Sequence, residues 1–286
     1  MEHELLNELP VAELAGDAQR PCSACAASDH APAPHVYALG KVEARFPNSS
    51  LEKEFAQCTG RADTVRLSDH EAFYSVVAKK ENRYLVREMC WVFRIQGIET
   101  YLLQPRDPAD FDLLVEAIRP RPSPMDIDAV IGARGPVAPP EFCSGLTVPF
   151  VRFDQIYSFD ADALVKAIPR SPQTADATFE PIAQEVFYRI MQMADNAGAT
   201  DEHRALNYLA MRCHSIYAQA AEQFAKDFAL VSVEARAPSL GDLHNVIDVI
   251  FTYVNRKTDF TEKFAVRVQM GKYPSLVRKL SPYLHR

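Results

Sequence analysis

The second half of the chain places two helical patterns directly before three strand patterns, and this order limits the folds available to it. Residues 179–196 and residues from 201 to about 227 have helical patterns. In the first of them apolar residues recur about every 3.6 positions, as on a core-facing stripe, at Ile182, Val186, Ile190 and Met193. The stretches LVSVEARA, NVIDVIFTYVN and TEKFAVRVQM follow and are typical of strands. A helical pair before consecutive strands predicts the α+β class, with helices on one face of an antiparallel β-meander.

The first half mixes strands and helices. Residues 36–46 resemble a strand, and Ser49 and Ser68 each stand three residues before a glutamate, as in the capping boxes that begin helices. The stretch CWVFRIQGIETYLLQP predicts a hairpin that turns near Gln96-Gly97. Two more strands are expected in DIDAVIGARG and VPFVRFDQIYSF, and Asp160 is expected to cap a short helix after them.

The stretch PRSPQTADAT, between Pro169 and Thr178, contains turn and linker residues throughout. A chain of 286 residues is long enough for two subdomains. We therefore expect an N-terminal segment over 1–35, a first α+β subdomain over 36–168 and a second subdomain over 179–286.

Charge and hydropathy narrow the range of partners. A net charge of −7 without a clustered basic face argues against nucleic acid as a partner. No apolar run approaches the roughly 20 residues of a membrane span, and the acidic N-terminus lacks the basic region of a secretory signal. A cytoplasmic protein is therefore expected, with its six cysteines reduced and used either as metal ligands or as buried thiols.

Cys22 and Cys25 form a Cys-x-x-Cys pair in a proline-rich segment, a spacing that lets two thiolates bind one Zn²⁺. Such a metal would order a segment that is otherwise loose. The remaining ligands would come from a second chain, in a possible homodimer, or from among Cys90, Cys143, His30 and His35. We predict a structural zinc held by Cys22, Cys25, Cys90 and Cys143, with plain buried thiols as the alternative.

A polar cluster begins the second helical stretch. Asp201, His203, Arg204 and Asn207 lie within two helical turns, after Thr200 at the predicted N-cap. The free N–H groups of a helix start favour anions, so these four residues are candidates for binding a peptide or a carboxylate. Helix capping with a local polar network explains the same residues equally simply.

No sequence motif of a known catalytic site appears. The chain lacks Gly-x-Ser-x-Gly, His-Glu-x-x-His and phosphate-binding glycine loops, and His70 is expected to be a surface residue in a first helical turn. A non-catalytic role is therefore favoured. An exposed edge of the strands between Ala229 and Met270 offers a place for a peptide to add as a further strand, unless helices cover it.

Several long stretches carry a family resemblance. They are YALGKVEARFP, ENRYLVREMCWVF, ETYLLQPRDPADFDLLVEAIRP, MQMADNAGATDEHRALNYLA and VRKLSPYL. Together they resemble the C-terminal domain of cyanobactin maturation proteases of the PatA/PatG type, from about residue 20 to the end. The subtilisin-like protease of those enzymes has no counterpart here, so the chain would be a free-standing relative or a fragment.

The resemblance implies a place in a pathway more than a reaction. It implies a non-catalytic accessory domain of a cyanobactin-like ribosomal-peptide (RiPP) pathway that binds the precursor peptide or partner enzymes. Two alternatives stay open: a peptide-modifying enzyme of unknown reaction, and a structural oligomer bridged by zinc.

Overall fold

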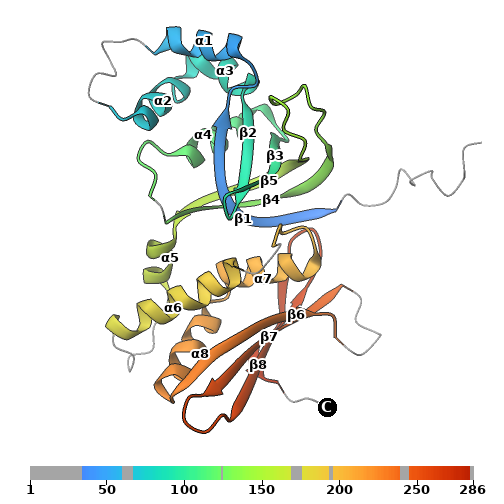
Figure 1. Ribbon diagram of the computed structural model, residues 1–286. Helices are drawn as coiled ribbons and strands as arrows, with labels where there is room; N and C mark the ends of the chain where they lie inside the picture. The colour runs from blue at the N-terminus through green and yellow to red at the C-terminus, as the bar shows by residue number, and fades with distance from the viewer. Residues whose placement is uncertain are drawn as a thin grey trace, which may run out of the picture. The chain divides into compact units, whose positions relative to one another are not determined.

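Five strands of the first half close into a barrel in the computed structural model (Figure 1). The strands are β1 (His35–Arg45), β2 (Cys90–Ile95), β3 (Ile98–Pro105), β4 (Asp126–Val137) and β5 (Pro149–Asp160). They follow each other around the barrel in the order β1-β2-β3-β5-β4, and β3 pairs with β5 in parallel while the other pairs are antiparallel. This is the strand order of an oligonucleotide/oligosaccharide-binding (OB) barrel.

The structure describes residues 34–59, 67–123, 125–168, 176–192, 196–238 and 245–283. They belong to a unit that extends from Ala33 to Arg286. Cys22, Cys25 and His30, and with them half of the predicted zinc ligands, lie outside the described residues.

Helices fill two of the barrel's connections. Between β1 and β2 lie α1 (Ser49–Cys58), α2 (Asp69–Val77), the short 3₁₀ turn η1 (Lys80–Asn82) and α3 (Arg83–Glu88). Between β3 and β4 lie η2 (Pro108–Asp110) and α4 (Phe111–Ile118). In Figure 1 these helices surround one end of the barrel.

The helix starts follow the predicted capping chemistry, with one correction. The Ser68 side chain accepts the N–H of Glu71, and the Glu71 carboxylate accepts the N–H of Ser68. This capping box at the start of α2 is therefore confirmed. The cap of α1 is Asn48 rather than the predicted Ser49. The Asn48 side chain accepts hydrogen bonds from the N–H groups of Ser50 and Leu51. Its own backbone is extended, so the helix begins at Ser49.

The predicted hairpin joins β2 and β3. Gln96 and Gly97 both have positive φ angles, of 51° and 81°. Two successive left-handed residues make the tight turn whose twist matches that of paired strands. The turn therefore forms at the predicted place.

Strand β1 of the barrel is buried on both faces along most of its first half. In β1, Val36 and Ala38 point into the core formed by the barrel interior and α1–α4, whereas Tyr37 and Leu39 point out into a second core. Successive side chains of a strand point to opposite faces, so an almost continuously apolar strand requires cover on both sides. That cover is provided by helices of the second half.

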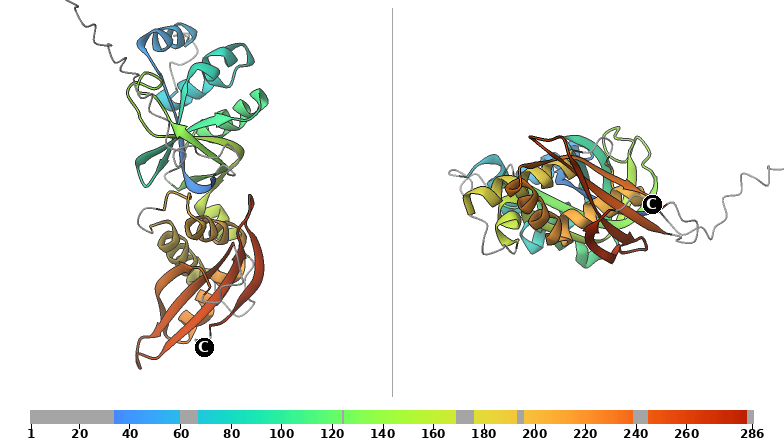
Figure 2. Two further views of the ribbon diagram at one scale, coloured as in Figure 1. Left: turned by 90° about the vertical axis from the view of Figure 1, so that its right-hand side faces the viewer. Right: turned by 90° about the horizontal axis from the view of Figure 1, so that it is seen from below.

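The second half forms a helical layer on an antiparallel meander. The helices are α5 (Ala161–Ala167), α6 (Asp176–Met191), α7 (Asp201–Arg212) and α8 (His214–Ala225). The strands are β6 (Phe228–Arg236), β7 (Val246–Asn255), β8 (Thr261–Gln269) and β9 (Ser275–Pro282), in that order in the sheet. Figure 2 shows helices on one side of this sheet, and the apolar residues of both elements share one core. The predicted α+β class with a C-terminal meander is confirmed.

Two details of the second half differ from the prediction. The helical stretch that begins at Asp201 breaks at Cys213, so it forms two helices instead of one. The strand β9 was not predicted, because most of its side chains are exposed and give no apolar alternation. Within the described residues no helix has the length and apolar character needed to span a membrane.

The segment before α7 approaches β1 closely, at a contact between Gly198 and Tyr37. Gly198 accepts a hydrogen bond from the N–H of Tyr37 at 2.9 Å, and its φ angle is +68°. A Cβ atom at this position would overlap the carbonyl oxygen of Tyr37, so the approach requires glycine. The proposed division into subdomains at 36–168 and 179–286 stays a prediction.

Candidate functional site

The outer face of β2 and β3 is covered by the chain itself. In OB barrels this face binds the ligand. Here the segment 138–148 lies against it, in a small apolar core formed by Cys90, Val92, Leu102, Ala138 and Cys143. A hydrogen bond from the N–H of Ala138 to the oxygen of Val148, at 2.9 Å, closes the segment at its base. This face is therefore closed to a ligand as long as the segment 138–148 covers it.

A disulfide between Cys90 and Cys143 links this segment to β2. The expectation that all six cysteines stay reduced is therefore wrong for this pair. Cys90 lies on the opposite face of β2 from Trp91, and both sulfurs are buried in the segment's own core. The sequence could not show that a loop 53 residues away returns to the start of β2.

The structure describes only half of the predicted zinc ligands. The structure places Cys90 and Cys143 side by side, whereas Cys22 and Cys25 are outside the described residues. His35, the alternative ligand that the structure does describe, begins β1. Among the described residues no group of three or more His, Cys, Asp or Glu side chains is arranged to hold a metal ion. The four-cysteine site stays a prediction.

The four candidate residues at the start of α7 differ in their contacts and in their burial. Thr200 caps the helix, as predicted, by accepting from the N–H of His203 at 3.2 Å. Arg204 is nearly buried: it donates to Asp201 at 2.8 Å and to the main-chain oxygen of Gly271. Asn207 is fully buried. Arg204 and Asn207 thus make contacts within the chain, and a role of the four residues in peptide binding stays a prediction.

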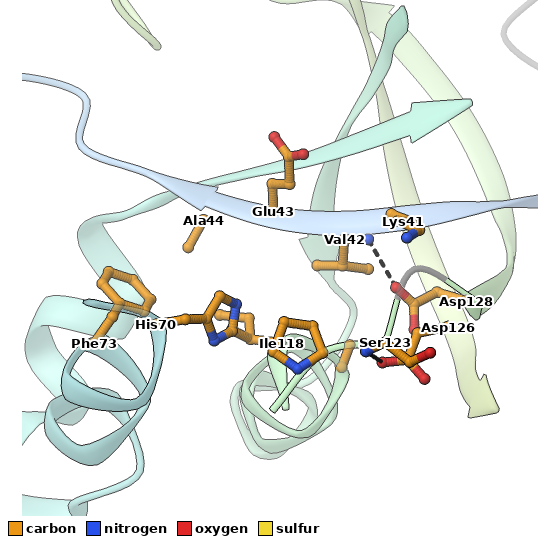
Figure 3. Close-up of a pocket in the computed structure, with 12 residues that line it drawn as sticks. Lys41, Val42, Glu43, Ala44, His70, Phe73, Ile118, Ser123, Asp126 and Asp128 are labelled. Atoms are coloured by element: carbon orange, nitrogen blue, oxygen red, sulfur yellow. Dashed lines mark hydrogen bonds between the residues drawn. The ribbon is translucent and has the colours of Figure 1, made fainter. Parts of the chain in front are cut away.

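The described surface is hollowed where β1 separates from β4 (Figure 3). The cavity, here called the β1 pocket, has a volume of about 400 Å³. Its lining comes from β1, α2, the end of α4 and the start of β4, and includes Lys41, Ala44, His70, Phe73, Ile118 and Asp128. Apolar side chains thus alternate with groups that can donate or accept hydrogen bonds, as in many small ligand pockets.

The pocket exists because β1 is longer than its pairing with β4. The β1–β4 register ends at Gly40, opposite Asp128, whereas β1 continues beside β2 from Lys41 to Arg45. The strand therefore separates from β4 at this point. In Figure 3 the ribbon of β1 passes over the opening, with side chains of α2 and α4 beneath it.

Asp128 closes the end of the β1–β4 ladder. Its Oδ2 accepts the N–H of Val42 at 2.7 Å, and its Oδ1 accepts the hydroxyl of Ser158 at 2.5 Å. The side chain is largely removed from water, and this burial raises the pKa of Asp128 to about 6 although both bonds favour the carboxylate. The pocket thus contains a carboxyl group that changes charge near neutral pH.

His70 lies in the first turn of α2, as predicted, but it is half-buried instead of on the open surface. Its ring projects into the β1 pocket near Ile118 (Figure 3). Nδ1 of His70 is buried and has no hydrogen-bond partner within the described part of the chain.

A second pocket, of about 440 Å³, adjoins the first. The two share Lys41, Glu43 and Asp126. The second pocket is further lined by the β2–β3 turn and by the end of α6, through Arg94, Gln96, Tyr188 and Met191. Gln96 also donates to the main-chain oxygen of Met191 at 2.5 Å, which holds the turn against α6.

Sequence reasoning missed the residues of the β1 pocket. One signal was present: Asp128 is a single acidic residue between Ile127 and Ala129 in a stretch otherwise typical of a buried strand. A buried carboxylate requires hydrogen-bond partners, so this position indicated that Asp128 has such partners in the fold. The pocket itself depends on the distance between β1, α2 and α4, which no sequence pattern gives.

Comparison with known proteins identifies the family. The PatG domain model matches residues 35–236, most of the chain. A solved structure described as "PatG Domain of Unknown Function" has 18% sequence identity to this chain and a TM-score of 0.70. It covers 88% of this chain, and the match covers 99% of that one, so the two share a fold. No curated protein matches the chain. The model covers more than half of the sequence, and the chain therefore belongs to the PatG domain family, as the resemblance predicted.

Proposed function

We propose that this protein is a non-catalytic accessory domain of a cyanobactin-like RiPP pathway that binds the precursor peptide or a partner enzyme. Membership of the PatG domain family supports the pathway. The observation that carries the binding role is the β1 pocket, about 400 Å³ in volume, in which apolar side chains lie beside hydrogen-bonding groups. Such a mixture suits a peptide side chain together with its polar backbone.

The test is a binding titration with the fluorescein-labelled precursor peptide and, in a second series, with the pathway's processing enzymes. Replacing His70 by alanine removes a ring that lines the pocket, and we expect Kd to rise about tenfold, which corresponds to about 1.4 kcal/mol of lost contact. His214→Ala is the matched control, because His214 also lies in a first helical turn but is exposed. Absence of saturable binding to any of these partners would refute the binding role.

A structural zinc belongs to the same proposal. Its ligands would be Cys22 and Cys25 together with Cys90 and Cys143. Only thiolates bind Zn²⁺, so this set requires that a thiol reductant first reduce the Cys90–Cys143 disulfide, which places the two sulfurs next to each other. Metal content of the purified full chain, wild type against the double variant Cys22→Ser/Cys25→Ser, decides this: equal zinc in both removes it.

Zinc shared between two chains is the oligomeric version of this site. Sizing of the full chain before and after chelation distinguishes the two arrangements. A bridging metal predicts that a dimer dissociates on chelation, and an unchanged size contradicts it.

One observation favours an enzyme as the second candidate. Burial raises the pKa of Asp128 to about 6 in a pocket that also contains His70, and groups with pKa values near neutral are suited to acid–base chemistry. Incubation with the precursor would then change its mass, and Asp128→Asn would abolish the change. An unchanged precursor mass, with and without added zinc, removes this candidate.

A further inference from the structure

We propose that the bound peptide is extended and adds to β1 as a further strand, at the edge formed by Val42 and Ala44. This inference rests on the proposed function, since it states how the β1 pocket recognises a peptide. It concerns the edge of the barrel, not the edges of the C-terminal meander.

The first support is the unpaired side of β1. On one side, residues Lys41–Arg45 pair with β2. On the other side the ladder with β4 ends at Gly40, so beyond this residue β1 pairs with none of the described strands on that side. A strand edge of this kind presents main-chain groups in the pattern that an extended peptide matches.

The direction of the main chain at this edge is fixed by one hydrogen bond. The N–H of Val42 points to Asp128, on the side away from β2. Main-chain groups two residues apart in a strand point to the same side. The N–H and C=O groups of Ala44 therefore point away from β2 too, toward the β1 pocket that Ala44 lines.

Asp128 sets where the added strand stops. Its carboxylate already occupies the N–H of Val42, so a peptide has the carbonyl of Val42 and both groups of Ala44 to pair with. This limits the pairing to a short segment and fixes its register, because a shift by one residue would face the wrong side of the strand.

The second support is the position of the two pockets. Val42 and Ala44 line the β1 pocket only, whereas Lys41 and Glu43, on the opposite face of β1, also line the second pocket. Side chains of an added strand alternate between these same two faces. Adjacent residues of one peptide would therefore reach different pockets.

The linings define the class of peptide. Phe73, Ala117 and Ile118 make the β1 pocket suited to an apolar side chain. The second pocket shares Lys41, Glu43 and Asp126 with the first, and adds the polar Arg94 beside the apolar Met191. The ligand is thus an extended segment that has an apolar residue for the β1 pocket. A helical ligand would satisfy its main chain internally and gain nothing from the edge of β1.

The experiment changes one donor on each side of the interface. Ala44→Pro removes the N–H that points to the pocket and leaves the β2 ladder intact, since proline is tolerated at strand edges. Ala44→Ser is the matched control, because it keeps the N–H. With the labelled precursor peptide as probe, we expect Ala44→Pro to raise Kd at least tenfold and Ala44→Ser to change it less than twofold. Thermal unfolding of both variants is the check that they are folded.

The second arm leaves the protein unchanged. Precursor peptides N-methylated at one position at a time should lose affinity at alternate positions of the bound segment, since each second N–H faces β1. Equal affinity of Ala44→Pro and Ala44→Ser, or N-methyl sensitivity spaced three and four residues apart, overturns strand addition while peptide binding itself stands. Absence of any binding by the wild type overturns the proposed function together with this inference.

Discussion

Asn207 of α7 donates a hydrogen bond from Nδ2 to the main-chain oxygen of Tyr37 in β1, at 2.8 Å and across 170 positions of sequence. The same side chain exchanges two further hydrogen bonds with Asn196, at 2.8 and 3.1 Å. All of these groups are buried. The contact therefore joins the barrel to the helical layer through polar groups that have no access to water.

Replacing Asn207 by alanine should destabilise the protein by roughly 3 kcal/mol, because the oxygen of Tyr37 and the amide of Asn196 remain buried without their partner. Urea denaturation measures the loss. Glu222→Ala is the control: it removes an exposed ion pair with Lys226, for which we expect less than about 1 kcal/mol. Similar values for the two variants would contradict this account.

Asp128 makes stability depend on pH. Its pKa is about 6 in the folded chain and 3.8 without the fold, so the folded state binds more protons between these values. The resulting stabilisation is complete below about pH 3.8 and is lost as pH rises through 6, a change on the order of 3 kcal/mol.

Asp128→Asn removes this titration and keeps both hydrogen bonds, because an amide can accept from Val42 and donate to Ser158. The variant should therefore gain stability relative to the wild type as pH increases from 4 to 7. Unfolding free energies measured at each pH give the difference, in which other titrating groups cancel. Parallel curves for the two proteins would show that burial does not raise this pKa.

The disulfide should stabilise the fold. It closes a loop of 53 residues, and the loss of unfolded-state entropy corresponds to about 4 kcal/mol. The double variant Cys90→Ala/Cys143→Ala should unfold at a correspondingly lower urea concentration. Cys58→Ala, which removes a cysteine outside the disulfide, should not.

A chemical check accompanies this prediction. The wild type in the presence of a reducing agent should become as unstable as the double variant. If reduction leaves its stability unchanged, the two sulfurs are not bonded in solution.

Two glycines with positive φ angles form a matched pair. Gly198 has φ +68° and no room for a Cβ next to Tyr37, whereas Gly145 has φ +90° and open space around it. Gly145→Ala should cost about 1 kcal/mol, the price of the left-handed backbone alone. Gly198→Ala should cost several kcal/mol, because the contact with β1 must also open. Equal losses in thermal denaturation would mean that the close approach is not maintained.

The candidate site could be predicted only where its chemistry is local. The capping box at Ser68, the turn at Gln96-Gly97 and the cap at Thr200 follow from residues within a few positions of each other, and the structure confirms them. The cap of α1 was misplaced by one residue, since Asn48 and Ser49 are both good caps and only the backbone geometry distinguishes them. The role of Asp128 was out of reach because its partner, Val42, is 86 residues away.

The sequence by itself determined the fold class and the family. Apolar periodicity places helices before the C-terminal strands, and long matching stretches indicate the PatG domain, because both signals are carried along the chain. The tertiary structure alone decided which residues share a pocket, that Cys90 bonds to Cys143, and that β1 extends past its pairing with β4. These three features depend on how far one element extends past another in space. Their free energy is spread over contacts between residues that are distant in the chain, so they leave no local pattern in the sequence.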